Sequence, residues 1–160
     1  MLPRATALRA NTPARCPVRS LEAGSRRYRP AVERRIDLSN LDLDQAADII
    51  AGRRPSWLAL GLIAEPLTWM DNDADWPRPL LTERDQAGRP MSLGVHLRGE
   101  ATEAEIVLYA GGWADADLVR WATAETFCEY AELDNADDFA PFLDHITKLM
   151  TTTAEPTPRT

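Results

Sequence analysis

Residues 92–133 read SLGVHLRGEATEAEIVLYAGGWADADLVRWATAETFCEYAEL, and this stretch decides the fold. Apolar and polar residues alternate through much of it with a period of two, which is typical of strands that bury one face. Gly111 and Gly112 favour a hairpin turn in its middle, because glycine accepts the positive φ that tight hairpin turns require. The stretch therefore predicts four antiparallel strands, over 92–98, 103–109, 113–121 and 123–133.

Segments with helical periodicity lie on both sides of these strands. The first is expected to be capped by Ser39 or Asn40, to end at Gly52, and to carry apolar residues at helical spacing: Leu43, Ala46, Ala47, Ile49 and Ile50. Pro55 is expected to prevent its continuation, so that 57–63 forms a buried strand, with a helix as the alternative. The second segment predicts a helix that begins near Asp138, with its apolar face made by Phe139, Phe142, Leu143, Ile146, Leu149 and Met150.

The resulting order is helix, strand, long loop, four strands, helix. This order predicts an α+β fold, in which an antiparallel β-meander of about four to five strands packs against an N-terminal and a C-terminal helix.

Charge and composition together divide the chain into three parts. Residues 1–35 hold nine arginines and two acids, whereas the whole chain has a net charge of -7. We expect 1–35 to be a disordered Arg-rich arm, 36–150 a single domain, and the Thr- and Pro-rich 151–160 a disordered tail. The arm is open to three interpretations: a targeting peptide, a nucleic-acid-binding arm, or an extension without function from a start site placed too far upstream.

The acidic run 71–75, DNDAD, begins like a calcium-binding loop. The pattern then fails, because Trp76 stands where the loop needs glycine and Thr82 where it needs a bidentate glutamate. The two histidines, His96 and His145, belong to no metal-binding pattern, and no nucleophile or phosphate-binding motif occurs. We therefore expect no metal, no cofactor and no catalytic residues.

Five tryptophans, at positions 57, 69, 76, 113 and 121, indicate a function more clearly than the acidic run or the histidines do. Trp69, Trp76 and Trp113 lie in or beside expected loops and turns among acidic residues, which is the composition of a binding surface for a basic partner. The alternative, that all five pack inward, stays open. The predicted partner-binding residues are Asp71, Asp73, Asp75, Trp76, Trp113, Asp115 and Asp117.

From Met91 to Ile146 the sequence resembles the TriTu-type immunity proteins of bacterial polymorphic toxin systems, which carry a motif W-x-S-G-x-A-D-x-E. Residues 109–117 read YAGGWADAD here, with direct matches at Gly112, Ala114 and Asp115 and a conservative one at Asp117. Residues 122–125, ATAE, resemble the family's T-G-E turn, and 133–146 resembles its closing helix.

The chain departs from the family pattern in three places. Tyr109 stands where the family has tryptophan, Ala124 stands where it has glycine, and 65–90 looks like an insertion. The resemblance implies a binding inhibitor without catalysis or cofactor.

The sequence thus predicts a non-enzymatic, cytoplasmic immunity-type protein that neutralises a cognate toxin through an acidic, Trp-containing surface. The expected partner is a basic protein toxin, because an acidic surface attracts and mimics what a basic groove binds. No membrane association is expected, because the longest nearly apolar run, 57–64, is far too short to span a bilayer. Nucleic-acid binding is not expected either. The alternatives are a structural or regulatory protein-interaction module, and a small enzyme with its site in the 65–90 loop.

Overall fold

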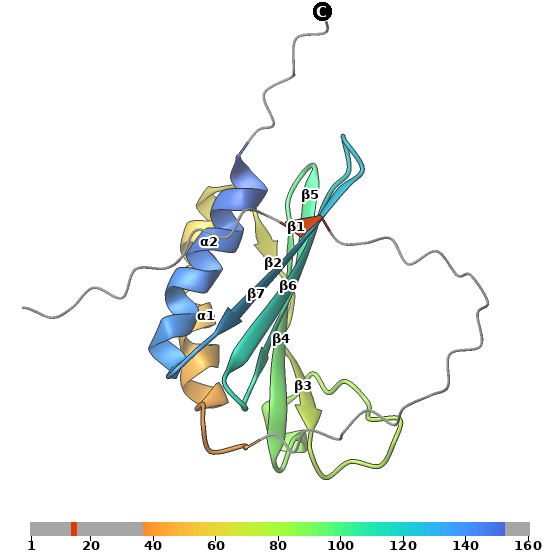
Figure 1. The fold of residues 1–160 in the computed structure, drawn as a ribbon, viewed down its shortest axis with the longest axis vertical. Coiled ribbons are helices and arrows are strands. Elements are labelled where there is room, and N and C mark those ends of the chain that lie inside the picture. The colour runs from red at the N-terminus through yellow and green to blue at the C-terminus, as the bar shows by residue number, and fades with distance from the viewer. Residues whose placement is uncertain (1–13, 16–36, 153–160) are drawn as a thin grey trace, which may run out of the picture.

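The computed structural model describes residues 14–15 and 37–152 (Figure 1). The helices are α1 (Leu43–Ala59) and α2 (Phe139–Thr151), with short 3-10 turns η1 (Arg84–Gln86) and η2 (Ala136–Asp138). The strands are β1 (Ala14–Arg15), β2 (Ile63–Ala64), β3 (Thr68–Asp71), β4 (Pro90–Arg98), β5 (Thr102–Tyr109), β6 (Trp113–Arg120) and β7 (Glu125–Glu132). Apart from β1, the expected arm falls outside the described residues, and so does the tail beyond Thr152.

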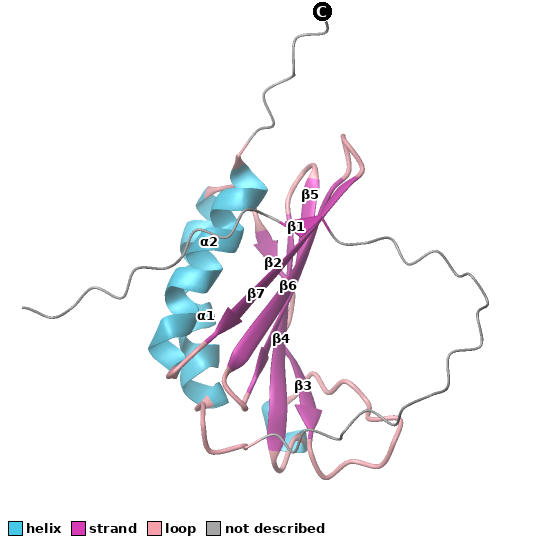
Figure 2. Cartoon of the chain, in the orientation of Figure 1, coloured by secondary structure: helices cyan, strands magenta, loops and turns pink. Residues whose placement is uncertain are grey.

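The strands form one antiparallel sheet in the order β1-β7-β6-β5-β4-β2, with β3 also paired to β4. Strands β4 to β7 are a continuous meander, and both helices cover the same face of it (Figure 2). The α+β meander predicted from the sequence is therefore confirmed, with β1, β2 and β3 as short additions at its edges.

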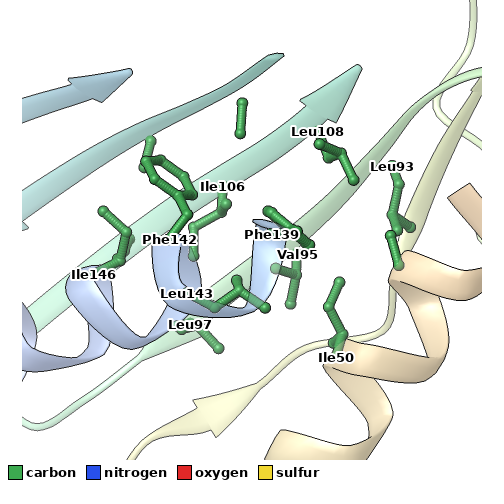
Figure 3. Close-up of a cluster of buried hydrophobic side chains, with 14 of the residues drawn as sticks. Ile50, Leu93, Val95, Leu97, Ile106, Leu108, Phe139, Phe142, Leu143 and Ile146 are labelled. Carbon is green, nitrogen blue, oxygen red and sulfur yellow. The ribbon is translucent and has the colours of Figure 1, made fainter. Parts of the chain in front are cut away.

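The core lies between the sheet and the two helices (Figure 3). Its sheet side comes from alternate residues of β4, β5 and β6, and its helix side from α1 and α2. Fully buried members include Leu93, Leu97, Ile106, Leu108, Leu118, Ile50, Phe139, Leu143 and Ile146. The period-two pattern of the strands thus sends their apolar residues to one face, and the other face receives the polar ones.

Helix α1 continues through Pro55, so the predictions that it ends at Gly52 and that 57–63 is a strand were wrong. Proline costs the helix one backbone hydrogen bond, and contacts with α2 on both sides of it offset this loss. Before it, Arg53 pairs with both carboxylate oxygens of Asp144, at 2.9 and 3.1 Å. After it, the buried Trp57 donates its indole N–H to the hydroxyl of Thr147 at 2.9 Å.

The helix caps also differ in part from expectation. The side chain of Asp42, rather than Ser39 or Asn40, accepts the backbone N–H groups of Asp44 and Gln45 at the start of α1. Helix α2 begins after Asp138, as the sequence predicted, and Pro141 is tolerated because it lies within the first turn.

Two turns of the β4–β7 meander hold residues with positive φ. Gly112, in the β5–β6 turn, has φ +101°, and Ala124, in the β6–β7 turn, has φ +53°. Glycine adopts this conformation freely, whereas the Cβ of alanine is crowded in it. The β6–β7 turn therefore holds a strained residue at the position where the resemblance expects glycine.

We expect Ala124→Gly to raise the free energy of unfolding by about 0.5–1 kcal/mol, because it removes the left-handed strain. The matched control is Ala122→Gly in the same turn, where φ is not positive. Chemical denaturation of both variants checks this. A lower free energy of unfolding in the Ala124→Gly protein would contradict the inference that Ala124 is strained.

Candidate protein-binding surface

The face of the meander opposite the helices carries no helix among the described residues (Figure 1). We call its outward residues on β5, β6 and β7 the open face. It includes three of the predicted partner-binding residues, Trp113, Asp115 and Asp117, on alternate positions of β6. The period of two brings these three side chains to one side of the sheet.

Negative charge gathers on the open face. The strand register sets Asp117 directly opposite Glu105 of β5, and Asp115 lies two residues further along β6. None of these three carboxylates takes part in an ion pair within the described chain. Like charges opposite each other in a sheet are destabilising. Partial burial, followed by the charge of Asp117, raises the pKa of Asp115.

The arginines of the domain lie elsewhere and have structural partners. Arg53 and Arg84 pair with Asp144 and Asp44, and Arg54 and Arg120 donate to backbone carbonyls. The remaining three, Arg78, Arg89 and Arg98, contact the β3–β4 loop or the β2–β3 connection. Within the described residues, no arginine or lysine therefore pairs with Glu105, Asp115 or Asp117.

Aromatic rings lie among these acids. The ring of Trp113 stacks on Tyr109 of β5, with centroids 4.9 Å apart and an interplanar angle of 17°. Gly111 makes room for this, because a Cβ at that position would clash with the indole. Tyr130 of β7, opposite Asp115, is 57% exposed. Burial and the charges of Asp115 and Glu105 raise the pKa of Tyr109. Rigid aromatic surface surrounded by charge is typical of protein-binding sites.

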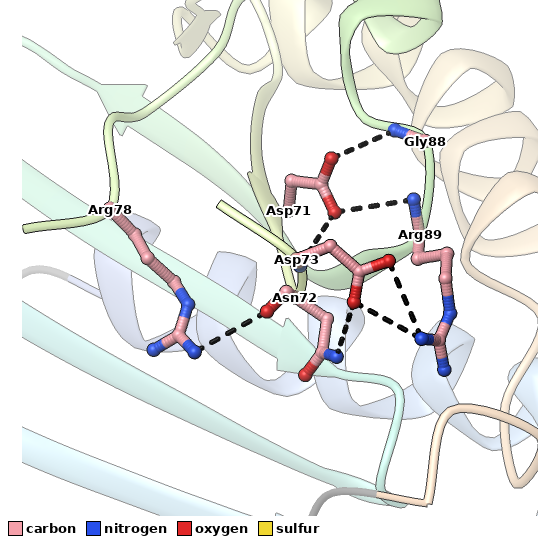
Figure 4. A network of polar contacts seen from close by, with 6 residues as sticks. All are labelled: Asp71, Asn72, Asp73, Arg78, Gly88 and Arg89. Atoms are coloured by element: carbon pink, nitrogen blue, oxygen red, sulfur yellow. Dashed lines mark hydrogen bonds and ion pairs between the residues drawn. The ribbon is translucent and has the colours of Figure 1, made fainter. Parts of the chain in front are cut away.

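The remaining predicted residues lie at the end of β3, at Asp71, or in the loop that follows it, and Figure 4 shows the contacts of Asp71 and Asp73. The carboxylate of Asp71 accepts the backbone N–H groups of Asp73 and Gly88 at 3.0 Å and of Arg89 at 3.3 Å. These bonds, the one from Asp73 first, lower the pKa of Asp71. Asp73 pairs with Arg89 at 3.1 Å. Both aspartates therefore hold the loop together, a role that the sequence did not reveal.

Asp75 and Trp76 are the outward members of this loop. Asp75 is exposed, and Trp76 is 83% exposed, the largest value among the exposed large hydrophobic residues of the described chain. The loop leaves β3 at the end of the sheet where the β5–β6 turn lies, but β3 and β6 are three strand spacings apart, about 14 Å. The predicted residues thus form two surfaces at one end of the sheet, which a large partner can span.

The other three tryptophans differ in how far they are exposed to solvent. Trp57 and Trp69 are buried at 2% and 3% exposure, so the expectation that Trp69 belongs to a binding surface was wrong. Strand β3 turns Trp69 into the core, where Arg84 lies over its ring. Trp121, which sequence reasoning left unassigned, is 60% exposed at the β6–β7 turn.

His96 is the centre of a separate cluster on β4. Its Nδ1 lies 3.0 Å from Glu65, and its Nε2 lies 2.5 Å from Glu103 of β5. Arg98 also pairs with Glu65, at 3.1 Å. The hydrogen bond to His96 is the main cause that lowers the pKa of Glu65. The cluster ties the β2–β3 connection to the sheet and contains no nucleophile.

A shallow depression between residues 38–44 and Arg89–Pro90 includes Asp42, which caps α1, and Asp44, which pairs with Arg84. No group of three or more possible metal ligands occurs within residues 37–152. None of the described helices is long and apolar enough to cross a membrane.

The chain matches no protein-family model, and searches of curated proteins and of solved structures found no similar protein.

Sequence reasoning missed Glu105, Tyr109 and Tyr130 as members of the open face. The alternation in β5 already set Glu105 and Tyr109 on the polar side of that strand. What it could not supply was the register, which brings Glu105 to Asp117 and Tyr109 to Trp113.

We expect Asp71→Ala to loosen the 72–89 loop, because three backbone N–H groups lose their acceptor. Cleavage of the loop by a protease should become several-fold faster, whereas Asp75→Ala, the matched control, should leave it unchanged. In the wild-type protein the same protection should be present at neutral pH and lost only as the pH falls through the lowered pKa of Asp71. Equal cleavage of both variants would show that Asp71 does not hold the loop.

We expect Asp115→Asn to raise the melting temperature at pH 7 by about 1–3 °C. A carboxyl whose pKa is raised by folding disfavours the folded state when it is ionised, and this cost disappears as the pH falls below its folded pKa. The gain should therefore shrink in acid. Differential scanning calorimetry at pH 7 and pH 4 checks both parts, and a loss of stability at pH 7 would contradict them.

Proposed function

We propose that this protein is a non-enzymatic binding protein that captures a basic protein on its open face and neutralises it. The observation that carries the proposal is the set of acids that have no ion pair within the described residues, Glu105, Asp115 and Asp117, around the stacked rings of Tyr109 and Trp113. A basic partner would remove the repulsion among the acids and cover the rings.

The charge of the domain supports fast capture. Residues 37–152 hold 22 acids against eight Arg and Lys, and the arginines are engaged in structural contacts. A field of one sign steers an oppositely charged protein and raises its association rate, while buried aromatic contacts slow its release. Trp76, exposed on the neighbouring loop, can extend this contact.

We further propose that the partner is a toxin, as in the immunity proteins that residues 91–146 resemble. Two backbone observations support this. Gly112 matches the glycine of the family motif and has positive φ, and Ala124, where the family has glycine, has positive φ as well. Both turns thus have the backbone shape that the motif's glycines favour. Many toxins of such systems are nucleases with basic grooves, which an acidic protein can occupy.

An enzyme with its site in the 65–90 loop is less well supported. Asp71 and Asp73 are engaged by backbone N–H groups and by Arg89, and Asp44 by Arg84. No two perturbed carboxyls converge with a nucleophile there, whereas acid–base catalysis needs such a grouping.

The test uses an inactivated variant of the toxin that we expect to be encoded beside this protein. We expect Asp115→Asn/Asp117→Asn to lower its association rate about 3–10-fold at low salt, and the loss to shrink at high salt. The control is Asp48→Asn/Glu83→Gln, which removes the same charge from exposed side chains without an ion pair in the described chain. Stopped-flow fluorescence measures both rates. Equal effects of the two double variants would refute the proposal that the partner binds the open face. The absence of a toxin gene beside the gene of this protein would refute the proposal that the partner is a toxin.

A further inference from the structure

Three successive cross-strand pairs lie on the open face next to the β5–β6 turn: Tyr109 with Trp113, Val107 with Asp115, and Glu105 with Asp117. An aromatic pair is thus followed by a mixed pair and then by an acidic pair. Successive residues on one face of a strand are about 7 Å apart, so a single long side chain of a partner can touch the rings and a carboxylate at the same time.

The aromatic pair is held in place by the fold. The rings of Tyr109 and Trp113 stack with centroids 4.9 Å apart, and both residues are half-buried. The indole lies close against Gly111, where a Cβ would clash with it. A side chain that is already fixed loses little conformational entropy when a partner binds. The two rings are therefore a preformed contact surface.

Carboxylates lie beside these rings. Burial, followed by the charges of Asp115 and Glu105, raises the pKa of Tyr109, so both carboxylates act on the same phenol. Asp115 is exposed and forms no ion pair within the described residues. Partial burial and the charge of Asp117 raise the pKa of Asp115, so its ionised form is disfavoured here. A cation beside the rings would stabilise that form.

Basic side chains of β4 and β6 contact other groups. His96 lies opposite Glu105 in the register, but its two ring nitrogens contact Glu65 and Glu103. Arg120 donates to a backbone carbonyl of α2. The two arginines that lie over aromatic rings in the described chain lie over rings other than the stacked pair. Within the described residues, no cation therefore occupies the position beside the stacked rings.

The chemistry of this position favours arginine over lysine. A guanidinium group is planar, so it can stack on an aromatic ring and donate two N–H groups to a carboxylate at the same time. It is also weakly hydrated, so its contact with the rings costs little desolvation. A lysine ammonium is a strongly hydrated point charge that cannot stack. The half-buried Val107, opposite Asp115, offers apolar surface to the methylene groups of the arginine.

We propose that Tyr109, Trp113 and Asp115 form an arginine-binding site, in which a guanidinium group of the partner stacks on the rings and donates to the carboxylate of Asp115. The inference rests on the proposed function in that the partner is basic. It adds which basic side chain the open face recognises, and it places that side chain at the centre of the contact.

The first part of the test uses the full wild-type chain and a short synthetic peptide of alternating glycine and arginine. One matched peptide has lysine in place of arginine, which keeps the charge, and another has citrulline, which keeps the planar shape and loses the charge. NMR titration of the tryptophan indole N–H signals measures the three affinities. We expect the lysine peptide to bind about fivefold more weakly than the arginine peptide, and the citrulline peptide not to bind.

The second part removes one ring. Trp113→Leu should weaken the arginine peptide to the affinity of the lysine peptide and leave the lysine peptide unchanged, because stacking is lost and the carboxylates stay. The matched control is Trp121→Leu, which removes an exposed indole at the β6–β7 turn and should change neither affinity. Circular dichroism checks that both variants are folded. If Trp113→Leu is not folded, the comparison of peptides on the wild-type chain still decides.

Two results would overturn the proposal: equal affinities of the arginine and lysine peptides for the wild-type chain, or equal effects of Trp113→Leu and Trp121→Leu in folded variants. The failure of this inference can be told apart from that of the proposed function. If the toxin responds to Asp115→Asn/Asp117→Asn but arginine is not preferred to lysine, the arginine site fails and the proposed function stands. If arginine is preferred but the toxin ignores the double variant, the proposed function fails and the arginine site stands.

Discussion

The register of β5 against β6 is the constraint on which both faces of this protein depend. The turn at Ala110–Gly112, with its positive φ at Gly112, pairs Tyr109 with Trp113 and thereby aligns every following pair. Because side chains alternate with a period of two, a slip of one residue would turn Asp115 and Asp117 into the core and Ala114 and Leu118 outward. The hydrophobic core and the open face are two consequences of one alignment.

The same alignment also brings carboxylates together, and their repulsion lowers the stability of the fold. It sets Glu105 against Asp117 and leaves Asp115 with a raised pKa, while the arginines serve the helices and the loop. Proteins that violate local rules of stability tend to do so at functional sites. This imbalance is the physical reason why we propose that a partner binds the open face rather than the helical side.

Much of the fold could be predicted from the sequence, because the signals were local. Period-two alternation located β4 to β7, and helical spacing located α2 near its observed start. Helix α1 is longer than predicted because its Arg53 and Trp57 contact α2, and these contacts offset the backbone hydrogen bond that Pro55 removes. A local sequence pattern does not reveal such contacts. Trp69 was misassigned for the same reason, since its burial depends on the pairing of β3 with β4.

The candidate site was predictable only in part. Composition pointed to Trp113, Asp115 and Asp117, but their neighbours on β5 and β7 depend on register. The loop acids Asp71 and Asp73 have the same composition and a different role, because backbone N–H groups and Arg89 converge on them only in the folded chain.

The most direct test of the account is the footprint of the partner, mapped by NMR chemical shifts on the labelled full chain bound to the inactivated toxin. We expect the largest changes to fall on Glu105, Trp113, Asp115 and Tyr130, on the face without helices. Changes confined to the outer surfaces of α1 and α2, with the open face unaltered, would contradict it.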